Sequence, residues 1–294
     1  MDLLNAETLV RLSSVKLRAR AVVDGVLTGL HKSPHQGQSV EFAEHKEYAP
    51  GDEIRHLDWK AYGKFDKYYV KRFEHETNLR GLIVIDSSGS MGYRSIAMSK
   101  LEVACTLAGA LAYLLVRQQD AAGLVVSHGE VVTDLPSRAT AGHLPVVLDA
   151  LDRLTPGGYT DLVRTADQLA EIASRRSLIM IFSDLFDDRA EALKRLLQLR
   201  ARKNDVAVFH LLDPAELTFP FDDLTLFLSM EDERKLEVNP REIKRSYLTE
   251  LQAFLSQVRG SCAEADVDYE LVRTDERLDS VLLRFLARRQ DRQR

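Results

Sequence analysis

The sequence predicts an α/β fold, a doubly wound domain with a mostly parallel sheet, preceded by a helix and a small β-rich segment. From Gly81 onward, short runs that are apolar at nearly every position alternate with longer runs that are apolar at helical spacing. Strands buried on both faces and separated by amphipathic helices are typical of a parallel sheet covered on both sides. We place the N-terminal helix and β-rich segment in residues 1–78 and the α/β domain in residues 79–294.

The N-terminal part combines a helical pattern with a segment of different composition. Apolar residues recur at helical spacing over residues 6–30 and end before the polar loop HKSPHQGQ, which predicts an opening helix. Residues 39–80 are charged and aromatic, with the turn APGDE in the middle and the alternating run KYYVKRFEHE after it. This pattern indicates short strands that lead into the next element.

The α/β domain begins with the apolar strand LIVID and the apolar helix LEVACTLAGALAYLLV. There follow two short strands around a His-Gly-Glu turn, the helix AGHLPVVLDALDRL, the loop TPGGYTD and the helix LVRTADQLAEIA. Next come the strand SLIMIF, the helix DRAEALKRLLQLRA and the strand DVAVFHLL. An insertion, FPFDDLTLFLSMEDERKLEVNP, predicts a short strand pair before the helix REIKRSYLTELQAFLSQV. The domain ends with the strand VDYELVRT and the helix LDSVLLRFLARRQ.

Composition and charge argue against several classes of protein. A net charge of -5 and a pI near 5.9 disfavour general binding to nucleic acid or to anionic membranes. No apolar run approaches the roughly 18 residues that cross a bilayer. The two cysteines, Cys105 and Cys262, lie far apart and are expected to be free buried thiols in a reducing compartment. We therefore expect a soluble cytoplasmic protein that neither binds nucleic acid nor inserts into a membrane.

Basic and aromatic residues are interleaved between Lys64 and Phe73. Surfaces that bind single-stranded nucleic acid combine the same residue types. A strand with one buried and one solvated face also explains the alternation. The acidic chain as a whole favours the strand.

Oxygen-bearing side chains gather where the predicted strands end. Asp86, Ser88 and Ser90 follow the strand LIVID, Asp184 follows SLIMIF, and Thr160 precedes a helix in the loop TPGGYTD. Ligands of such sheets bind at the carboxyl ends of the strands, where these loops meet. Hydroxyl and carboxylate oxygens suit Mg²⁺, Mn²⁺ or Ca²⁺, so the sequence predicts a metal site here. A polar strand-to-helix turn without metal would explain DSSGS alone.

Neighbouring acids have simpler interpretations. Asp161, beside Thr160, is expected to be the N-cap of the following helix rather than a ligand. Asp187 and Asp188 are expected to lie at a helix start, where their charge favours the helix dipole.

The pattern Asp86-x-Ser88-x-Ser90, with Thr160 in a Gly-rich loop and Asp184 after a later strand, resembles the metal-ion-dependent adhesion site of von Willebrand factor A domains. The resemblance implies that Ser88, Ser90 and Thr160 coordinate the metal, and that Asp86 and Asp184 act directly or through water. It also implies that an acidic side chain of a partner protein fills the remaining coordination position.

A second set of motif residues lies upstream of the strand LIVID, namely Glu41, Phe42, Tyr48, Pro50, Gly51, Asp52, Arg55, Asp58, Trp59 and Lys60. These residues make the segment similar to the signature of the bacterial domain of unknown function 58 family. Lys46 departs from the pattern, because an arginine is common there. Members usually sit beside MoxR-type AAA+ ATPases, so the resemblance implies an adaptor or assembly role with such an ATPase. Many relatives carry N-terminal membrane helices, which this sequence lacks.

These observations lead to one main hypothesis and two alternatives. We expect a non-enzymatic, metal-dependent protein-binding module that works with a MoxR-type ATPase on a client protein offering an acidic side chain. A Mg²⁺-dependent phosphohydrolase would use Asp86 as its nucleophile. Haloacid-dehalogenase-like sites of that kind place a second acid two residues later, where this chain has Ser88. A metal-free scaffold would make its contacts through the β-rich segment.

Overall fold

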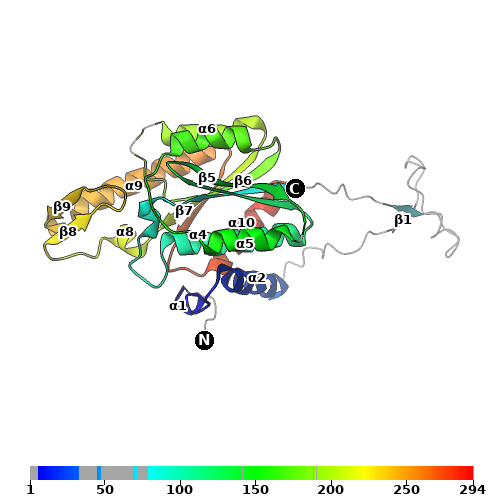
Figure 1. Ribbon diagram of the computed structural model, residues 1–294, viewed down its shortest axis with the longest axis horizontal. Helices are drawn as coiled ribbons and strands as arrows, with labels where there is room; N and C mark the ends of the chain where they lie inside the picture. Colours follow the sequence, from blue (N-terminus) through cyan, green and yellow to red (C-terminus); the bar gives the residue numbers. More distant parts are fainter. Residues whose placement is uncertain are drawn as a thin grey trace. The chain divides into compact units, whose positions relative to one another are not determined.

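A computed structural model describes residues 6–32, 45–47, 69–71, 79–140, 142–187, 189 and 191–293. The chain divides into two compact units, one formed by Met1–Gly29 with Leu79–Arg294 and the other by Leu30–Asn78. The larger unit is an α/β domain with helices on both faces of a central sheet, which confirms the predicted fold class (Figure 1).

The central sheet has six strands in the order β10-β7-β6-β3-β4-β5. Their bounds are β3 (Arg80–Asp86), β4 (Ala121–His128), β5 (Glu130–Arg138), β6 (Ser177–Ser183), β7 (Asp205–Leu212) and β10 (Asp268–Arg273). All neighbours are parallel except β4 and β5, which form an antiparallel pair at one edge. Gly129 makes this turn possible, because its φ of 73° is one that few other residues adopt.

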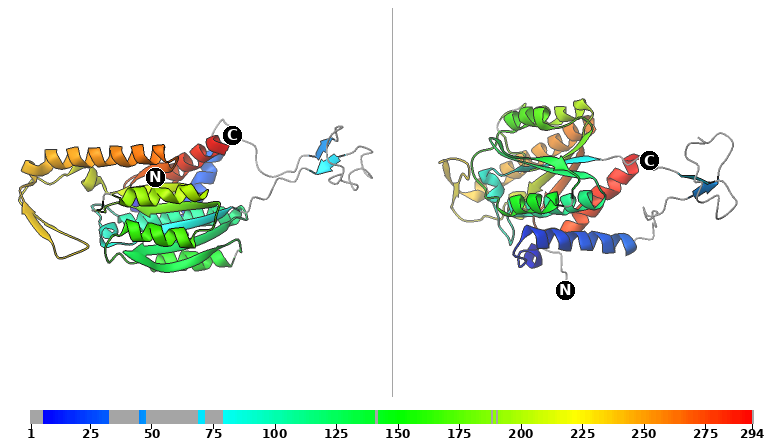
Figure 2. Two further views of the ribbon diagram at one scale, coloured as in Figure 1. Left: turned by 90° about the horizontal axis from the view of Figure 1, so that it is seen from above. Right: turned by 45° about the vertical axis from the view of Figure 1, so that its right-hand side comes forward.

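Alternate side chains of the inner strands enter two separate cores. Ile83 and Ile85 of β3 belong to one core, whereas Leu82 and Val84 belong to the other. The first core is covered by α4 (Lys100–Arg117), α5 (His143–Asp152) and α10 (Leu278–Gln293). The second is covered by α6 (Leu162–Ile172), α7 (Ala192–Leu197) and α9 (Pro240–Glu264), as Figure 2 shows. A short 3-10 helix, η3 (Gln198–Arg202), follows α7.

The N-terminal helices belong to the α/β unit. After α1 (Ala6–Leu9), helix α2 (Val15–Lys32) packs against the outer side of α4. A Cβ added to Gly109 of α4 would lie 3.1 Å from side-chain atoms of both Val15 and Ala19, so the glycine allows this close approach. The sequence-based boundary grouped this helix with the β-rich segment, whereas in the structure its apolar face completes the first core.

The insertion forms a hairpin of β8 (Thr225–Leu228) and β9 (Lys235–Val238), as predicted. A short helix that the sequence pattern did not indicate, α8 (Pro214–Thr218), precedes it. Phe227 of β8 packs against Phe219 and Phe221, and Phe219 also packs against Tyr247 of α9. These aromatic rings fasten the base of the hairpin to the α/β unit.

The smaller unit contains the antiparallel pair β1 (His45–Glu47) and β2 (Tyr69–Lys71), in agreement with a β-rich segment. The ten signature residues between Glu41 and Lys60 lie outside the described residues. In the described part of the chain, both cysteines are free and buried, and no helix is long and apolar enough to cross a membrane.

Candidate functional site

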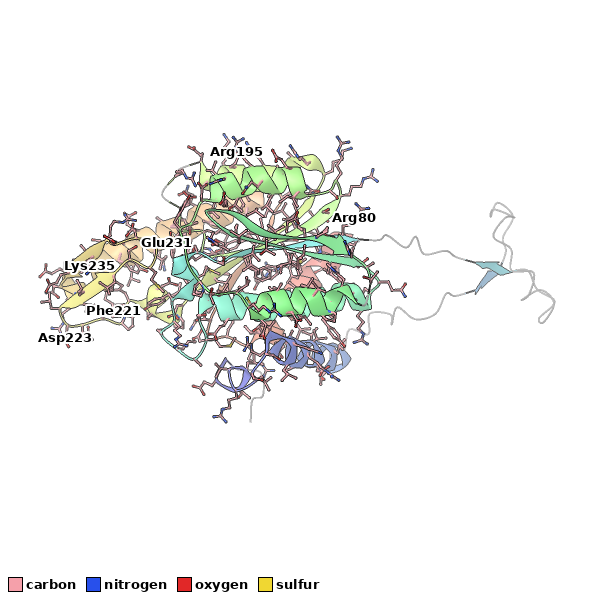
Figure 3. All side chains as sticks on the ribbon, in the orientation of Figure 1. Arg80, Arg195, Phe221, Asp223, Glu231 and Lys235 are labelled. Atoms are coloured by element: carbon pink, nitrogen blue, oxygen red, sulfur yellow. The ribbon has the colours of Figure 1, made fainter. Side chains whose placement is uncertain are left out.

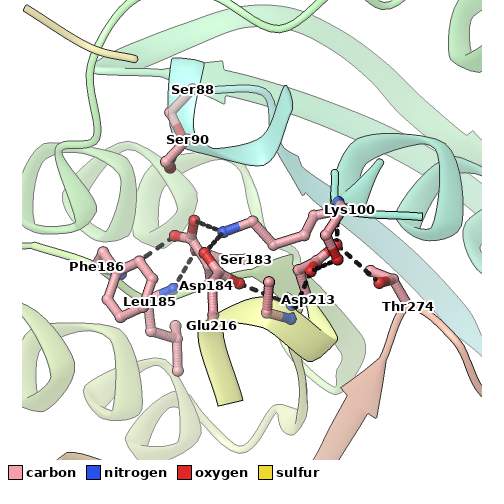
Figure 4. A network of polar contacts seen from close by, with 12 residues as sticks. Ser88, Ser90, Lys100, Ser183, Asp184, Leu185, Phe186, Asp213, Glu216 and Thr274 are labelled. Atoms are coloured by element: carbon pink, nitrogen blue, oxygen red, sulfur yellow. Dashed lines mark hydrogen bonds and ion pairs between the residues drawn. The ribbon is translucent and has the colours of Figure 1, made fainter. Parts of the chain in front are cut away.

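Three adjacent strands end in buried acids at one edge of the sheet. Asp86 is the last residue of β3, Asp184 directly follows β6, and Asp213 directly follows β7. Their exposed fractions are 5%, 0% and 0%. The parallel order β7-β6-β3 therefore brings carboxylates from distant segments to the same edge. Figure 4 shows two of these residues, Asp184 and Asp213, from close by.

The loop after β3 folds back over Asp86. One carboxylate oxygen of Asp86 accepts a hydrogen bond from the Ser88 N–H (2.9 Å), and the other accepts one from the Ser183 hydroxyl (2.7 Å). The hydroxyl oxygens of Ser88 and Ser90 lie 3.2 Å apart. Ser90 belongs to the 3-10 helix η2 (Gly89–Gly92). The spacing in Asp86-x-Ser88-x-Ser90 thus places two hydroxyls beside each other next to a buried acid.

Asp86 is a buried carboxylate beside a second acid. Burial and the nearby charge of Asp184 raise the pKa of Asp86 to about 6, although hydrogen bonds from Ser183 and Ser88 oppose the shift. Among the described residues, Asp86 forms no salt bridge with a lysine, arginine or histidine. A cation bound near it would stabilise the ionised form and lower this pKa.

Asp184 has a cation partner within the chain. The Lys100 ammonium donates to Asp184 (2.8 Å) and to Glu216 (2.6 Å), and the Lys100 side chain is completely buried. Burial alone would lower the pKa of Lys100, but the two carboxylates raise it above its usual value. Lys100 therefore remains a positive charge inside the site, where it neutralises acids that a metal would otherwise have to compensate.

Helix ends explain why these groups meet. Ser99 and Glu102 form a capping box that starts α4 at Lys100. Asp213 and Glu216 form a second capping box at α8, and burial raises the pKa of Glu216 although Lys100 opposes the shift. Asp213 also accepts a hydrogen bond from the Ser95 N–H (2.8 Å), which fixes the loop that leads into α4.

The backbone after Asp184 turns sharply. Leu185 has a φ of 58°, a left-handed conformation that leucine rarely adopts. The turn lets the Phe186 N–H donate to Asp184 (3.2 Å) and places the Phe186 ring 5.3 Å from the Lys100 nitrogen. A strained residue at this position is consistent with a functional site.

Thr160 lies near the loop after β3 but has its own partner. Its N–H and its hydroxyl donate to the two carboxylate oxygens of Glu231, at 2.9 and 3.0 Å. Ser90, Thr160 and Glu231 line one cavity of about 510 Å³. The segment before Thr160 is bonded to residues 87–92 after β3, the Ser-rich loop, because the Gly89 N–H donates to the Gly158 carbonyl (3.2 Å).

The neighbouring acids act as helix caps. Asp161 accepts a hydrogen bond from the Arg164 N–H (2.7 Å), which confirms its prediction as the N-cap of α6. Asp187 was expected to lie at a helix start. Its carboxylate accepts a hydrogen bond from the Leu162 N–H (2.8 Å), so it caps the start of α6 from a neighbouring loop and does not begin α7, the helix that follows it. Asp188 lies outside the described residues.

The structure brings three of the five predicted ligands together and gives the other two side chains partners within the chain. Asp86, Ser88 and Ser90 are contiguous and offer the hard oxygen atoms that Mg²⁺, Mn²⁺ or Ca²⁺ prefers. Asp184 faces Lys100, and Thr160 faces Glu231. Within the described ranges there is no group of three or more His, Cys, Asp or Glu side chains that could hold a metal. Any coordination here would depend on the hydroxyls, and metal binding stays a prediction.

Several residues of the site were not predicted. Lys100 could have been suspected, because a lysine in the first turn of so apolar a helix needs a partner if it is buried. The sequence D-P-A-E at Asp213–Glu216 is a capping-box signal. Ser183 and Glu231 carry no comparable local signal, since their roles depend on contacts with distant segments.

Comparison with known proteins finds relatives in sequence and solved structures that align with this chain. The chain is 26% identical over 212 residues to an uncharacterized protein of Mycobacterium tuberculosis, a match that covers 71% of this chain and 66% of the relative. Among solved structures, a conserved hypothetical protein, BatB, from Bacteroides thetaiotaomicron aligns with 14% identity and a TM-score of 0.46, over 71% of this chain and 98% of that one. An aerotolerance-related membrane protein from Bacteroides fragilis aligns with 17% identity and the same TM-score, over 71% and 97%.

A protein-family model matches a similar share of the chain. The model of the family described as protein of unknown function DUF58 matches residues 44–254, which is more than half of the chain. This range includes the Ser-rich loop, Thr160, Asp184 and the β8–β9 hairpin. The chain therefore belongs to the DUF58 family.

Proposed function

We propose that this chain is a non-enzymatic, metal-dependent protein-binding module, an adaptor that works with a MoxR-type AAA+ ATPase in the assembly or maturation of client proteins. The observation that carries the proposal is the pair of hydroxyls, on Ser88 and Ser90, beside the buried and unpaired Asp86. The resemblance to the DUF58 signature suggests the ATPase as partner, and the resemblance to von Willebrand factor A domains suggests the acidic side chain of the client. With such an ATPase as partner, the protein acts in the cytoplasm.

The chemistry of the donor set favours binding over catalysis. Neutral hydroxyls donate less negative charge to a metal than carboxylates do, so a bound Mg²⁺ would supply a strongly electrophilic position for a partner's Asp or Glu. Asp86 is held by Ser88 and Ser183, which keeps its carboxylate oriented but also engages both of its oxygens. No second acid stands at position 88 to support phosphoryl transfer.

A co-purification experiment tests the proposal. A purified MoxR-type ATPase is mixed with the full chain in Mg²⁺, and the retained protein is measured for the wild type, Ser88→Ala and, as a matched control, the exposed Ser256→Ala. We expect retention by the wild type and Ser256→Ala, and loss for Ser88→Ala or when a chelator is added. Retention that is unchanged by both Ser88→Ala and the chelator would remove the metal from the proposal.

A metal-free scaffold is the second candidate, because Lys100 already supplies a positive charge between Asp184 and Glu216. Isothermal titration with Mg²⁺ and Mn²⁺ separates the two candidates. Absence of heat at millimolar metal, with partner binding retained, would favour the scaffold.

A further inference from the structure

Thr160 is already bound to a carboxylate from the same chain. Its N–H and its hydroxyl each donate to a different oxygen of Glu231, at 2.9 and 3.0 Å. The two residues are 71 positions apart in the sequence, so this contact comes from tertiary packing. A main-chain N–H and a neighbouring hydroxyl that converge on one carboxylate make a small binding site for that group.

Glu231 reaches Thr160 from the loop between β8 and β9. Figure 3 shows Glu231 close to the α/β domain, whereas Lys235 of β9 and Asp223, which precedes β8, lie farther out. The loop is seated closely: a Cβ added to Gly89 would lie only 1.9 Å from the Met230 carbonyl oxygen. The Met230 side chain also comes within 3.3 Å of where a Cβ of Gly92 would be. The hairpin loop therefore covers the Ser-rich loop as well as Thr160.

The outer part of the hairpin is weakly anchored. Leu224, Leu226 and Leu228 have exposed fractions of 69%, 55% and 60%, and Leu236 on β9 has 57%. These side chains contribute little burial energy to holding the hairpin in place. Segments with few buried apolar contacts open at low free energy. The aromatic base formed by Phe219, Phe221 and Phe227 can remain in place while the loop moves.

We propose that Thr160 forms a carboxylate-binding subsite at the candidate site, and that Glu231 is its internal, displaceable occupant. The inference rests on the proposed binding function, because it assigns the acid of a partner to the position that Glu231 fills. A partner carboxylate must displace the β8–β9 loop to reach Thr160. Its apparent affinity is therefore the intrinsic affinity multiplied by the fraction of chains in which the loop is open.

The test uses the full chain, labelled with ¹⁵N, and acetate as the carboxylate probe in the presence of a chelator. The wild type is compared with Glu231→Ala and with Glu237→Ala, which removes an exposed acid from β9 of the same hairpin. Hydrogen exchange of the Thr160 amide and its chemical shift during an acetate titration are the readouts. Spectra of residues in the central sheet show whether each variant is folded.

We expect the Thr160 amide to exchange about tenfold faster in Glu231→Ala, because a charged hydrogen-bond acceptor is lost. Acetate should shift the Thr160 resonance with about tenfold higher apparent affinity in this variant than in the wild type or Glu237→Ala. Equal exchange and equal acetate affinity in all three proteins would overturn the proposal.

A parallel titration with Mn²⁺ separates this proposal from the proposed function. If acetate acts as expected but no protein binds Mn²⁺, the carboxylate subsite stands and the metal-dependent function falls. If the wild type binds Mn²⁺ while Glu231→Ala gains no affinity for acetate, the subsite falls and the metal-dependent function stands.

Discussion

At the scale of single residues, two neighbouring acids of the site differ in how their charge is compensated. Asp184 contacts the Lys100 ammonium, whereas Asp86 receives hydrogen bonds only from neutral groups. An isolated buried charge is far more unfavourable than a paired one. Within the described part of the chain, the site therefore pairs one carboxylate with a cation and gives the other only neutral donors.

Replacement of Asp86 by Asn should stabilise the metal-free protein. The pKa of Asp86 rises from 3.8 to about 6 on folding, so its ionisation opposes folding fully above pH 6 and not at all below pH 3.8. We expect Asp86→Asn to raise the free energy of unfolding by up to about 3 kcal/mol at pH 7.5 and by much less at pH 4. Urea unfolding in a chelator measures both values.

The exposed Asp134 on β5 provides the control, since Asp134→Asn should change neither value by more than about 0.5 kcal/mol. A destabilised Asp86→Asn at pH 7.5 would contradict the interpretation of Asp86 as an uncompensated charge. The same variant should lose any stabilisation by Mg²⁺.

Replacement of Lys100 by Met should have the opposite effect. The variant keeps the volume of the side chain but leaves Asp184 and Glu216 buried without their cation. Removal of one partner of a buried ion pair costs about 3–5 kcal/mol. Urea unfolding of Lys100→Met, compared with the exposed control Lys194→Met, measures this loss. A loss similar to that of the control would show that Lys100 does not hold the two acids together.

At the scale of elements, the two faces of β8 differ in their surroundings. Leu226 and Leu228 point to solvent, whereas Phe227 between them enters the aromatic base. We expect Leu226→Thr and Leu228→Thr each to change stability by less than about 0.5 kcal/mol, and Phe227→Ala to cost about 2 kcal/mol. Thermal unfolding of the three variants provides the measurement. Equal losses of stability in the three variants would contradict the assignment of Phe227 to the buried side of β8.

Most elements of the α/β unit could be predicted because their signals are local. The strand β3 is apolar at consecutive positions, and helix α4 begins at the capping box of Ser99 and Glu102. The short helix α8 escaped prediction because its five residues show no helical period of apolar residues. Helix α2 was recognised as a helix, but the sequence does not state that its apolar face packs on α4.

The candidate site could be predicted only in part, because some of its contacts have local signals in the sequence and others do not. Asp86, Ser88 and Ser90 could be predicted to lie together because they follow one strand within five residues. Asp184 could be placed at the same edge because parallel strands share their carboxyl ends. The ion pairs of Lys100 and the contact of Thr160 with Glu231 join segments more than 70 residues apart. No local pattern encodes such partners, since they depend on how the loops pack after the sheet has formed.

At the scale of the whole molecule, the larger unit takes up both ends of the chain. Val15, Ala19, Val22, Val23 and Val26 of α2 are buried in the same core as Leu282 and Phe285 of α10. The α/β domain is therefore completed by a helix that is separated from it in sequence by the smaller unit. A boundary drawn at residue 79 divides one hydrophobic core.

A chain that begins at residue 79 should consequently be much less stable. Removal of α1 and α2 exposes the outer face of α4 and takes away six buried apolar side chains, Leu9 among them, for an expected loss of at least about 5 kcal/mol. Urea unfolding of this shortened chain is compared with that of a chain in which residues 1–29 are joined to residue 79 by a flexible linker. Equal stability of the two would show that α2 is not part of the core.

The close contact at Gly89 has a consequence for how the site could be opened by mutation. A single methyl group at this position would collide with the Met230 backbone, so Gly89→Ala should push the hairpin loop away from the Ser-rich loop. We expect Gly89→Ala to speed the exchange of the Thr160 amide even though Glu231 is intact, as hydrogen exchange would measure. Unchanged exchange would mean that the loop yields without releasing Thr160. The hairpin loop can thus lie over the site because residue 89 is a glycine and has no Cβ atom.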